Sequence, residues 1–218
     1  MITSEWIEAR MNTIINDDCL NVMKQVPDKY FDLVLTDPPY GIDWKPILYS
    51  SGAKKGKLEK NHNHFEWDVK TPSITAFEEI ERVSKKQLIW GANYFNCFTT
   101  GGALVWYKNR GAETLSDCEI ASVSWQKKVG YVKKQALSGF VAEEKNYHPT
   151  QKPLKLIEFC LEYAKAETTW KVFDPFMGSG ATAVACQSLG LDWCGCELDP
   201  DYVAIANKRL EKVQGSLF

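Results

Sequence analysis

The sequence lacks the features of secreted, membrane-bound and strongly basic proteins. No apolar run approaches the roughly 20 residues that a membrane-spanning helix needs. The first residues, MITSEWIEARMN, have no apolar core of a secretion signal. The net charge is only −2, which argues against a histone-like binder but leaves room for a local basic patch. We expect a cytoplasmic protein with no membrane partner.

Sets of cysteine and histidine that could bind a metal are also missing. The seven cysteines are odd in number and scattered. The closest pair, Cys194 and Cys196, has no second pair and no histidine near it. Structural zinc sites need four such ligands at short spacings. We therefore predict free thiols, a reducing compartment and no metal site.

What is present is the balance of an ordinary globular protein, with 44% hydrophobic and 25% charged residues over 218 positions. That length suits one domain. Strand-like segments at 12–17, 31–37, 87–92, 102–107, 119–125, 129–134, 170–174 and 192–198 alternate with helix-like segments at 18–27, 73–84, 152–167, 180–190 and 200–213. This alternation predicts an α/β fold with a mostly parallel open sheet and helices on both faces.

Basic residues gather in two places. Residues 45–60 hold five lysines and one acid, within a loop predicted at about 41–70. Residues 108–134 hold five lysines and one arginine against three acids. Such clusters are most often solvated surface, so neither indicates a function by itself.

A glycine-rich loop follows a predicted strand and opens a helix. Gly178 and Gly180 permit close approach of a ligand to the backbone, and the helix start offers free N–H groups. Glu197 ends the next strand, where a carboxylate can bind ribose hydroxyls. Asp174, ahead of the glycines, would repel a pyrophosphate but suits a cationic ligand. S-adenosylmethionine has an ammonium, a sulfonium and no phosphate. The alternatives are a plain turn and, because GSGATA fits G-x-G-x-x-A, a dinucleotide site.

A second unusual stretch, DLVLTDPPYGIDW (32–44), ends a predicted core strand with Asp37, Pro38, Pro39 and Tyr40. Two prolines give a stiff extended corner with unpaired carbonyls. A carboxylate and an aromatic ring flank them. This set can hold a flat ring with an exocyclic amino group: the ring stacks on Tyr40, and the amino protons go to Asp37 and the carbonyl of Pro38.

The same acceptors can activate the amino group. Its lone pair is delocalised into the ring, and hydrogen bonds to its protons favour a more tetrahedral, nucleophilic nitrogen. Because these acceptors stabilise the positive charge that develops on nitrogen, they favour the transition state over the ground state. No covalent nucleophile is required.

These motifs together resemble amino-group DNA methyltransferases that use S-adenosylmethionine. TDPPY (36–40) is similar to their catalytic motif, and DPFMGSG (174–180) to their cofactor motif, F-x-G-x-G. HPTQKPL (148–154) resembles the segment before the first cofactor strand, and residues 16–40 resemble the lead-in to the catalytic motif. The catalytic motif comes about 140 residues first, as in the permuted β group. The likeness spans about 12–213 and implies a Rossmann-like methyltransferase fold.

The resemblance implies roles for individual residues. The catalytic corner comprises Asp37, Pro38, Pro39 and Tyr40. The cofactor site comprises Asp18, Cys19, His148, Thr150, Gln151, Lys152, Asp174, Pro175, Phe176, Gly178, Ser179, Gly180, Glu197 and Leu198. Within this set, Asp18 and Cys19 would lie near the adenine, and the 148–152 segment would bind the methionine carboxylate, although it also reads as a plain helix start.

The resemblance further implies double-stranded DNA as substrate, with a base flipped into the corner. In this family the motif DPPY is more typical of enzymes that methylate adenine N6, and SPPY of those that methylate cytosine N4, so we expect adenine. Phosphate contacts are expected from Lys54, Lys55, Lys57, Lys127 and Lys128. Larger relatives carry a separate target-recognition domain, for which only about 108–147 is available here. A short target, loose specificity or a homodimer on one duplex would follow.

Other readings remain open at this level. An NAD-dependent oxidoreductase would use GSGATA but leaves the proline corner unexplained. A non-catalytic DNA-binding module would need neither corner. RNA or a protein glutamine could replace DNA as the acceptor, although Asp37 in place of an asparagine favours a nucleobase.

Overall fold

The computed structural model describes residues 2–42, 70–97, 100–108, 116–133 and 151–214. Within them lies one eight-stranded sheet, in the order β1-β8-β7-β2-β3-β5-β4-β6. The strands are β1 (Ile14–Ile15), β2 (Phe31–Thr36), β3 (Ser84–Trp90), β4 (Ala103–Tyr107), β5 (Cys118–Val123), β6 (Val129–Lys133), β7 (Lys171–Asp174) and β8 (Asp192–Cys196).

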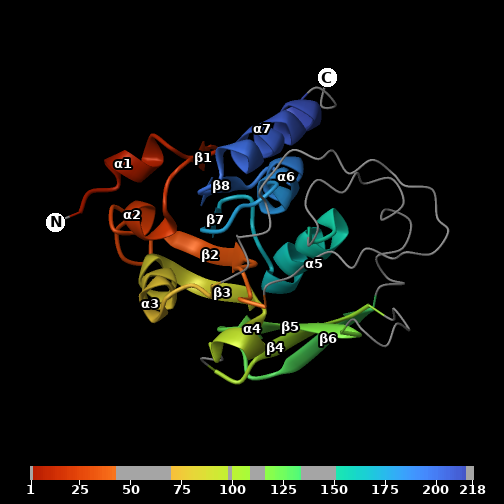
Figure 1. The fold of residues 1–218 in the computed structure, drawn as a ribbon. Coiled ribbons are helices and arrows are strands. Elements are labelled where there is room, and N and C mark those ends of the chain that lie inside the picture. Colours follow the sequence, from red (N-terminus) through yellow and green to blue (C-terminus); the bar gives the residue numbers. More distant parts are fainter. Residues whose placement is uncertain (1, 43–69, 98–99, 109–115, 134–150, 215–218) are drawn as a thin grey trace.

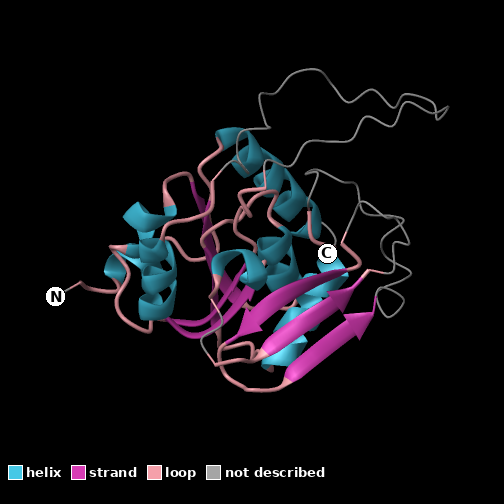
Figure 2. Ribbon diagram, turned by 60° about the horizontal axis from the view of Figure 1, so that its bottom comes forward, coloured by secondary structure: helices cyan, strands magenta, loops and turns pink. Residues whose placement is uncertain are grey.

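The sheet is parallel except around β5. Strands β1, β8, β7, β2 and β3 pair in parallel. Strand β5 lies antiparallel to both β3 and β4, and β6 pairs in parallel with β4. In Figure 2 the strands β4, β5 and β6 come forward at one side of the sheet. The predicted mostly parallel α/β sheet is confirmed.

Helices cover both faces of the sheet (Figure 1). On one side are α1 (Glu5–Glu8), α2 (Cys19–Met23) and α3 (Ile74–Val83); on the other are α5 (Leu154–Ala164), α6 (Ala181–Ser188) and α7 (Pro200–Gln214). A short α4 (Ala92–Phe95) follows β3. Among these helices, none is long and apolar enough to cross a membrane.

Alternating side chains of the central strands divide the core into two layers. In β2, Leu33 and Leu35 pack with the side of α5, α6 and α7, whereas Val34 packs with the side of α2 and α3. Successive residues of a strand point to opposite faces, so a strand covered on both faces must be apolar throughout. The side chains of these three residues are fully buried, as expected for a strand in the interior of the sheet.

The eight strands and the five longer helices match the segments predicted from the sequence. The four-residue helices α1 and α4 were not predicted, because four residues give no periodicity. The loop predicted at about 41–70 lies almost entirely outside the described residues. Of the predicted insertion at about 108–147, the structure describes 108 and 116–133, which form β5 and β6.

Candidate active site

One cavity of about 830 Å³ lies at the carboxyl edge of the parallel strands. Ligands of open α/β sheets bind at this edge, because each strand there delivers the residue that follows it to a common place. Residues after β1, β2, β3, β4, β7 and β8 all line the cavity: Asp17, Asp37, Gly91, Lys108, Pro175 and Glu197. The proline corner and the glycine loop therefore share one cavity although about 140 residues separate them.

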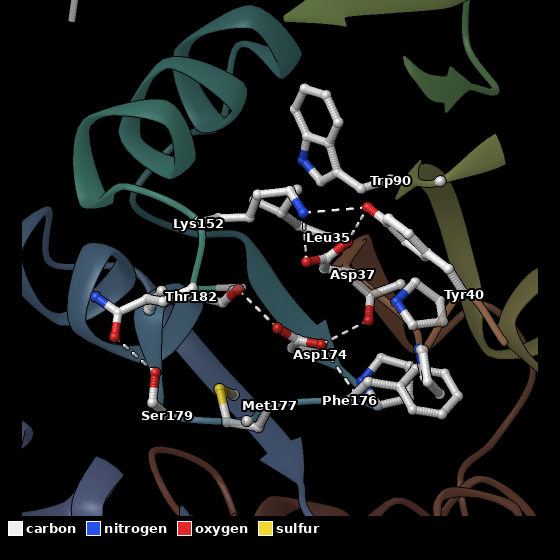
Figure 3. Close-up of a pocket in the computed structure, with 18 of the residues that line it drawn as sticks. Leu35, Asp37, Tyr40, Trp90, Lys152, Asp174, Phe176, Met177, Ser179 and Thr182 are labelled. Carbon is white, nitrogen blue, oxygen red and sulfur yellow. Dashed lines mark hydrogen bonds and ion pairs between the residues drawn. The ribbon is translucent and has the colours of Figure 1, made fainter. Parts of the chain in front are cut away.

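The proline corner is held by side-chain contacts (Figure 3). The Tyr40 hydroxyl donates to Asp37 Oδ1 over 2.6 Å. The ammonium of Lys152 lies 2.5 Å from Asp37 Oδ2 and 3.1 Å from the Tyr40 hydroxyl. Pro38 is buried, and Asp37, Pro39 and Tyr40 are half-buried. All four corner residues line the cavity.

The ring of Tyr40 packs between aromatic and glycine neighbours. It stacks on Tyr94 of α4 with ring centroids 4.7 Å apart and an interplanar angle of 16°, and it meets Phe95 edge-on. Gly91 adopts φ +75°, and a Cβ there would lie only 2.2 Å from Tyr40 Cε1. The close approach of ring and backbone therefore requires glycine at 91.

Lys152 belongs to the corner rather than to the glycine loop. Its ammonium contacts Asp37, and also Glu119 Oε2 at 2.9 Å. Burial would lower the pKa of Lys152, but Asp37, Tyr40 and Glu119 raise it well above its ordinary value. Burial raises the pKa of Asp37, and the lysine charge opposes that shift. The expected contact of Lys152 with a methionine carboxylate remains a prediction, since this ammonium already has two carboxylate partners.

A second carboxylate, Asp174, joins the corner to the glycine loop. Its Oδ1 accepts from the Thr36 hydroxyl at 2.6 Å and from the Phe176 amide at 3.0 Å. Its Oδ2 accepts from the Thr182 hydroxyl at 2.6 Å. Burial raises the pKa of Asp174 to about 6 despite these bonds. Three internal donors occupy this carboxylate, so the structure supports a bridging role over the expected contact with a cationic ligand.

The glycine loop faces the cavity with its backbone. Gly178 has φ +54°, and a Cβ built on it meets nothing within 4 Å. Its amide donates to Glu197 Oε2 over 2.8 Å, and the Asp199 amide donates to Glu197 Oε1 over 2.9 Å. Burial raises the pKa of Glu197, opposed by these backbone bonds. Ser179 donates to Gln151 Oε1 over 3.0 Å, which ties the loop to the start of α5.

Asp18 and Cys19 also line the cavity. Asp18 caps α2 by accepting from the Leu20 amide. Burial raises the pKa of the Cys19 thiol to about 11, so it is a neutral thiol near pH 7 and no nucleophile. Leu198 is exposed at the rim and also lines the cavity.

The structure does not bring every predicted residue to the cavity. Gly180 is not among the lining residues; it packs against Ala206 of α7. Glu119 lies near the start of β5, whereas Lys127 and Lys128 follow the end of that strand. The two lysines are exposed and lie at the edge of the sheet away from the cavity. They therefore do not line the cavity, and their expected phosphate contacts remain a prediction. The remaining predicted residues, His148, Thr150, Lys54, Lys55 and Lys57, lie outside the described ranges.

Sequence reasoning missed several residues of the cavity. They come from the ends of β3 and β4 and from the start of β5: Trp90, Gly91, Trp106, Lys108 and Glu119. A position after a predicted strand was a usable signal for Lys108, whereas Gly91 was predicted to lie within the strand at 87–92. No sequence signal marked Glu119, because the antiparallel direction of β5 alone brings its first residues to this edge.

Comparison with known proteins agrees with this geometry. Residues 105–208 match the family model described as DNA methylase, of the N6/N4 type. The Type II methyltransferase M2.LlaDCHI of Lactococcus lactis subsp. cremoris is 23% identical over 97% of this chain and 94% of its own length.

Two solved structures share the fold. TTHA0409 of Thermus thermophilus, a putative DNA modification methylase complexed with S-adenosyl-L-methionine, aligns with a TM-score of 0.56 at 19% identity, over 92% of this chain and 93% of that one. The cytosine-N4-specific PvuII DNA methyltransferase aligns with a TM-score of 0.56 at 17% identity, over 94% and 93%. The predicted resemblance to amino-group DNA methyltransferases is thereby confirmed: residues 105–208 match the N6/N4 DNA methylase domain.

Proposed function

We propose that this protein transfers a methyl group from S-adenosylmethionine to the exocyclic N6 of an adenine flipped out of double-stranded DNA. The observation that carries the proposal is the shared cavity, which joins an acceptor corner for an amino group to a glycine loop for a nucleoside. A neighbour of the same fold is described as complexed with S-adenosyl-L-methionine, which supports that methyl donor here.

The cavity fits the donor in size and in polar groups. A volume of about 830 Å³ lies in the range of ligand sites. The unobstructed backbone at Gly178 permits close contact, and Glu197 offers its carboxylate to ribose hydroxyls. Asp18, Cys19, Phe176 and Leu198 would border the adenine. When bound, S-adenosylmethionine supplies an electrophilic methyl carbon, and the electron pair of the broken carbon–sulfur bond stays on sulfur.

The corner would hold the base and direct its amino group. The base ring would lie against Tyr40, which Tyr94 and Gly91 fix in place. The amino protons would go to Asp37 and to the carbonyl of Pro38. As the new carbon–nitrogen bond forms, the nitrogen becomes cationic, and the carboxylate stabilises it more than it stabilises the neutral amine. Burial raises the pKa of Asp37, which makes it a better acceptor for the proton that nitrogen must release.

The insertion at about 108–147 is our candidate for target recognition. Five of its described residues line the cavity: Lys108, Ser116, Cys118, Glu119 and Ile120. The lysine-rich loop at 41–70 is our candidate for phosphate contact, through Lys54, Lys55 and Lys57. A homodimer on one duplex would extend so small a recognition surface.

Sequencing that detects modified bases would test the proposal. The purified protein is incubated with unmethylated duplex DNA and S-adenosylmethionine, and the product shows base, atom and target sequence together. We expect N6-methyladenine; N4-methylcytosine, the mark of a cytosine-N4 enzyme such as the PvuII methyltransferase, would correct the base. Asp37→Ala is the control and should transfer no methyl group while still binding the cofactor. Full activity of that variant would refute the mechanism.

A further inference from the structure

Four charged side chains, two buried lysines and two half-buried carboxylates, form one chain of ion pairs beside the corner. Lys152 bridges Asp37 and Glu119, at 2.5 and 2.9 Å. On the far side, Lys108 lies 2.6 Å from Glu119 Oε1. The two lysines expose only 5% and 9% of their side chains. The four residues come from four places in the chain: the corner, the start of α5, β5 and the end of β4.

This arrangement places Lys152 in competition with the substrate. Asp37 Oδ1 accepts from Tyr40 and Oδ2 from Lys152. An exocyclic amino group needs one of these oxygens, and like an ammonium it is an N–H donor. A carboxylate oxygen can accept two hydrogen bonds, but the amino group and the ammonium would compete as N–H donors for Oδ2, and this lysine exposes only 5% of its side chain. A buried cation without a partner is strongly unfavourable, so Lys152 needs another acceptor when it leaves.

Glu119 has such an acceptor available. Its Oε1 accepts from Lys108, while its Oε2 lies 2.9 Å from the Lys152 ammonium yet has no aligned hydrogen bond among the described residues. A small rotation of the ammonium would complete that bond. Burial would raise the pKa of Glu119, but Lys152 and Lys108 lower it to about 2, so it remains a carboxylate at neutral pH.

We propose that Lys152 holds the place of the target amino group on Asp37 and that Glu119 is the positioning residue that receives its ammonium when the base enters. Lys108 fixes Glu119 for this task. The exchange keeps the lysine paired with a carboxylate before and after the base binds, while Asp37 passes from the ammonium to a hydrogen bond with the amino group. This inference rests on the proposed function, because it assigns the entering amino group to the methyl acceptor.

A stability measurement tests the shared lysine independently of catalysis. Asp37→Asn, Glu119→Gln and their combination form a double-mutant cycle, read by urea unfolding. If one carboxylate is removed and the ammonium moves fully onto the other, each single substitution lowers the free energy of unfolding only a little. The double substitution, which leaves the ammonium without a carboxylate, then lowers it by more than the sum of the two single effects. Direct repulsion between the carboxylates has the same sign, so the cycle is repeated in Lys152→Met. The excess must shrink there; an excess of equal size in both backgrounds, or simple additivity, would overturn the proposal.

Methyl-transfer kinetics supply the second test. In Glu119→Gln, Asp37 is the one carboxylate left of the two that Lys152 contacts, and we expect kcat/KM for DNA to fall by about 10- to 100-fold while the cofactor dissociation constant is unchanged. In the Lys152→Met background, Glu119→Gln should add no further loss, which distinguishes positioning from a general structural role. Asp32→Asn is the matched control and should keep wild-type rates. It removes the carboxylate from an ion pair with Lys85, 2.7 Å long, that lies outside the cavity.

The two proposals fail in different ways. Absence of methyl transfer by the wild-type protein would refute the proposed function, while the unfolding cycle would still report whether Lys152 is shared. An active wild type with unchanged kcat/KM in Glu119→Gln would refute the positioning role alone. Loss of transfer in Glu119→Gln that persists in the Lys152→Met background would also refute it, since Glu119 would then act without the lysine.

Discussion

The ring of Tyr40 owes its position to its neighbours more than to the two prolines before it. Prolines fix the backbone but leave the tyrosine side chain free to rotate. Stacking on Tyr94, the bond to Asp37 and the bare backbone of Gly91 remove that freedom. The sequence could show that an aromatic ring and a carboxylate flank the corner. It could not show the glycine that makes room for the ring.

Gly91→Ala should therefore abolish most methyl transfer. Its Cβ would lie 2.2 Å from the Tyr40 ring, so the ring must move away from the base. Gly101→Ala is the matched control, because Gly101 has nearly the same φ, +76°, and nothing within 4 Å of its Cβ. Both variants should lose about 1–2 kcal/mol of stability from left-handed backbone strain. Steady-state kinetics should show a loss of 100-fold or more in Gly91→Ala only; equal rates in the two variants would contradict the role of Tyr40.

Gly178 permits the same design for the cofactor. Gly178→Ala would put a methyl group into the cavity, where the Cβ meets no protein atom. Gly190→Ala carries comparable strain, at φ +68°, also with open space, but Gly190 does not line the cavity. We expect calorimetric titration to show cofactor binding weakened by tenfold or more in Gly178→Ala and within twofold of wild type in Gly190→Ala. Wild-type affinity in Gly178→Ala would place the cofactor elsewhere.

At the scale of elements, Asp174 explains how two loops keep a common geometry. It ends β7 and accepts from Thr36 at the end of β2 and from Thr182 in α6. The corner and the glycine loop are thereby held to one buried carboxylate. From the sequence, Asp174 was interpreted by its charge alone. Its hydrogen bond with Thr36 could not be predicted from the sequence, because it depends on the sheet topology, which places β2 beside β7.

This buried carboxylate should leave a pH signature in stability. Burial raises the pKa of Asp174 from 3.8 to about 6, so between these values the folded state retains a proton that the unfolded state has lost. Its stabilising contribution is complete below pH 3.8 and is lost as pH rises through about 6, on the order of 2–3 kcal/mol. Urea unfolding between pH 4 and 7.5 should show this decline in wild type relative to Asp174→Asn. Parallel pH curves for the two proteins would contradict the shift.

Element boundaries were predictable where packing is regular and less so where polar residues extend a strand. Strand β3 begins at Ser84, directly after α3, and not at 87 as predicted. Lys85 and Lys86 looked unlike strand residues, yet Lys85 pairs with Asp32 and Lys86 lies 4.4 Å from the Trp170 ring centroid. Long side chains of this kind cover apolar surface while their charge stays accessible. Such compensation is a tertiary effect that local patterns cannot show.

At the scale of the whole molecule, parallel topology explains why so much of the site could be predicted. All strands of a parallel sheet present their carboxyl ends at one edge, so residues after predicted strands could be assigned to a common place before any distance was known. The rule fails at β5, the one antiparallel strand of the described sheet. It brings Glu119 to the cavity and carries Lys127 and Lys128 to the opposite edge.

Those two lysines give a test of which edge meets DNA. Each phosphate contact contributes about 0.9 to the slope of log binding constant against log salt concentration. Lys127→Gln with Lys128→Gln should leave that slope unchanged, because both residues lie far from the cavity. Lys54→Gln with Lys55→Gln removes the same charge from another adjacent pair and should lower the slope by about 2 if both bind phosphate. Fluorescence anisotropy with a labelled duplex at several salt concentrations measures both. A lowered slope in the Lys127→Gln, Lys128→Gln variant would indicate that DNA binds at the other edge of the sheet, away from the flipped base. That result would require a different docking geometry.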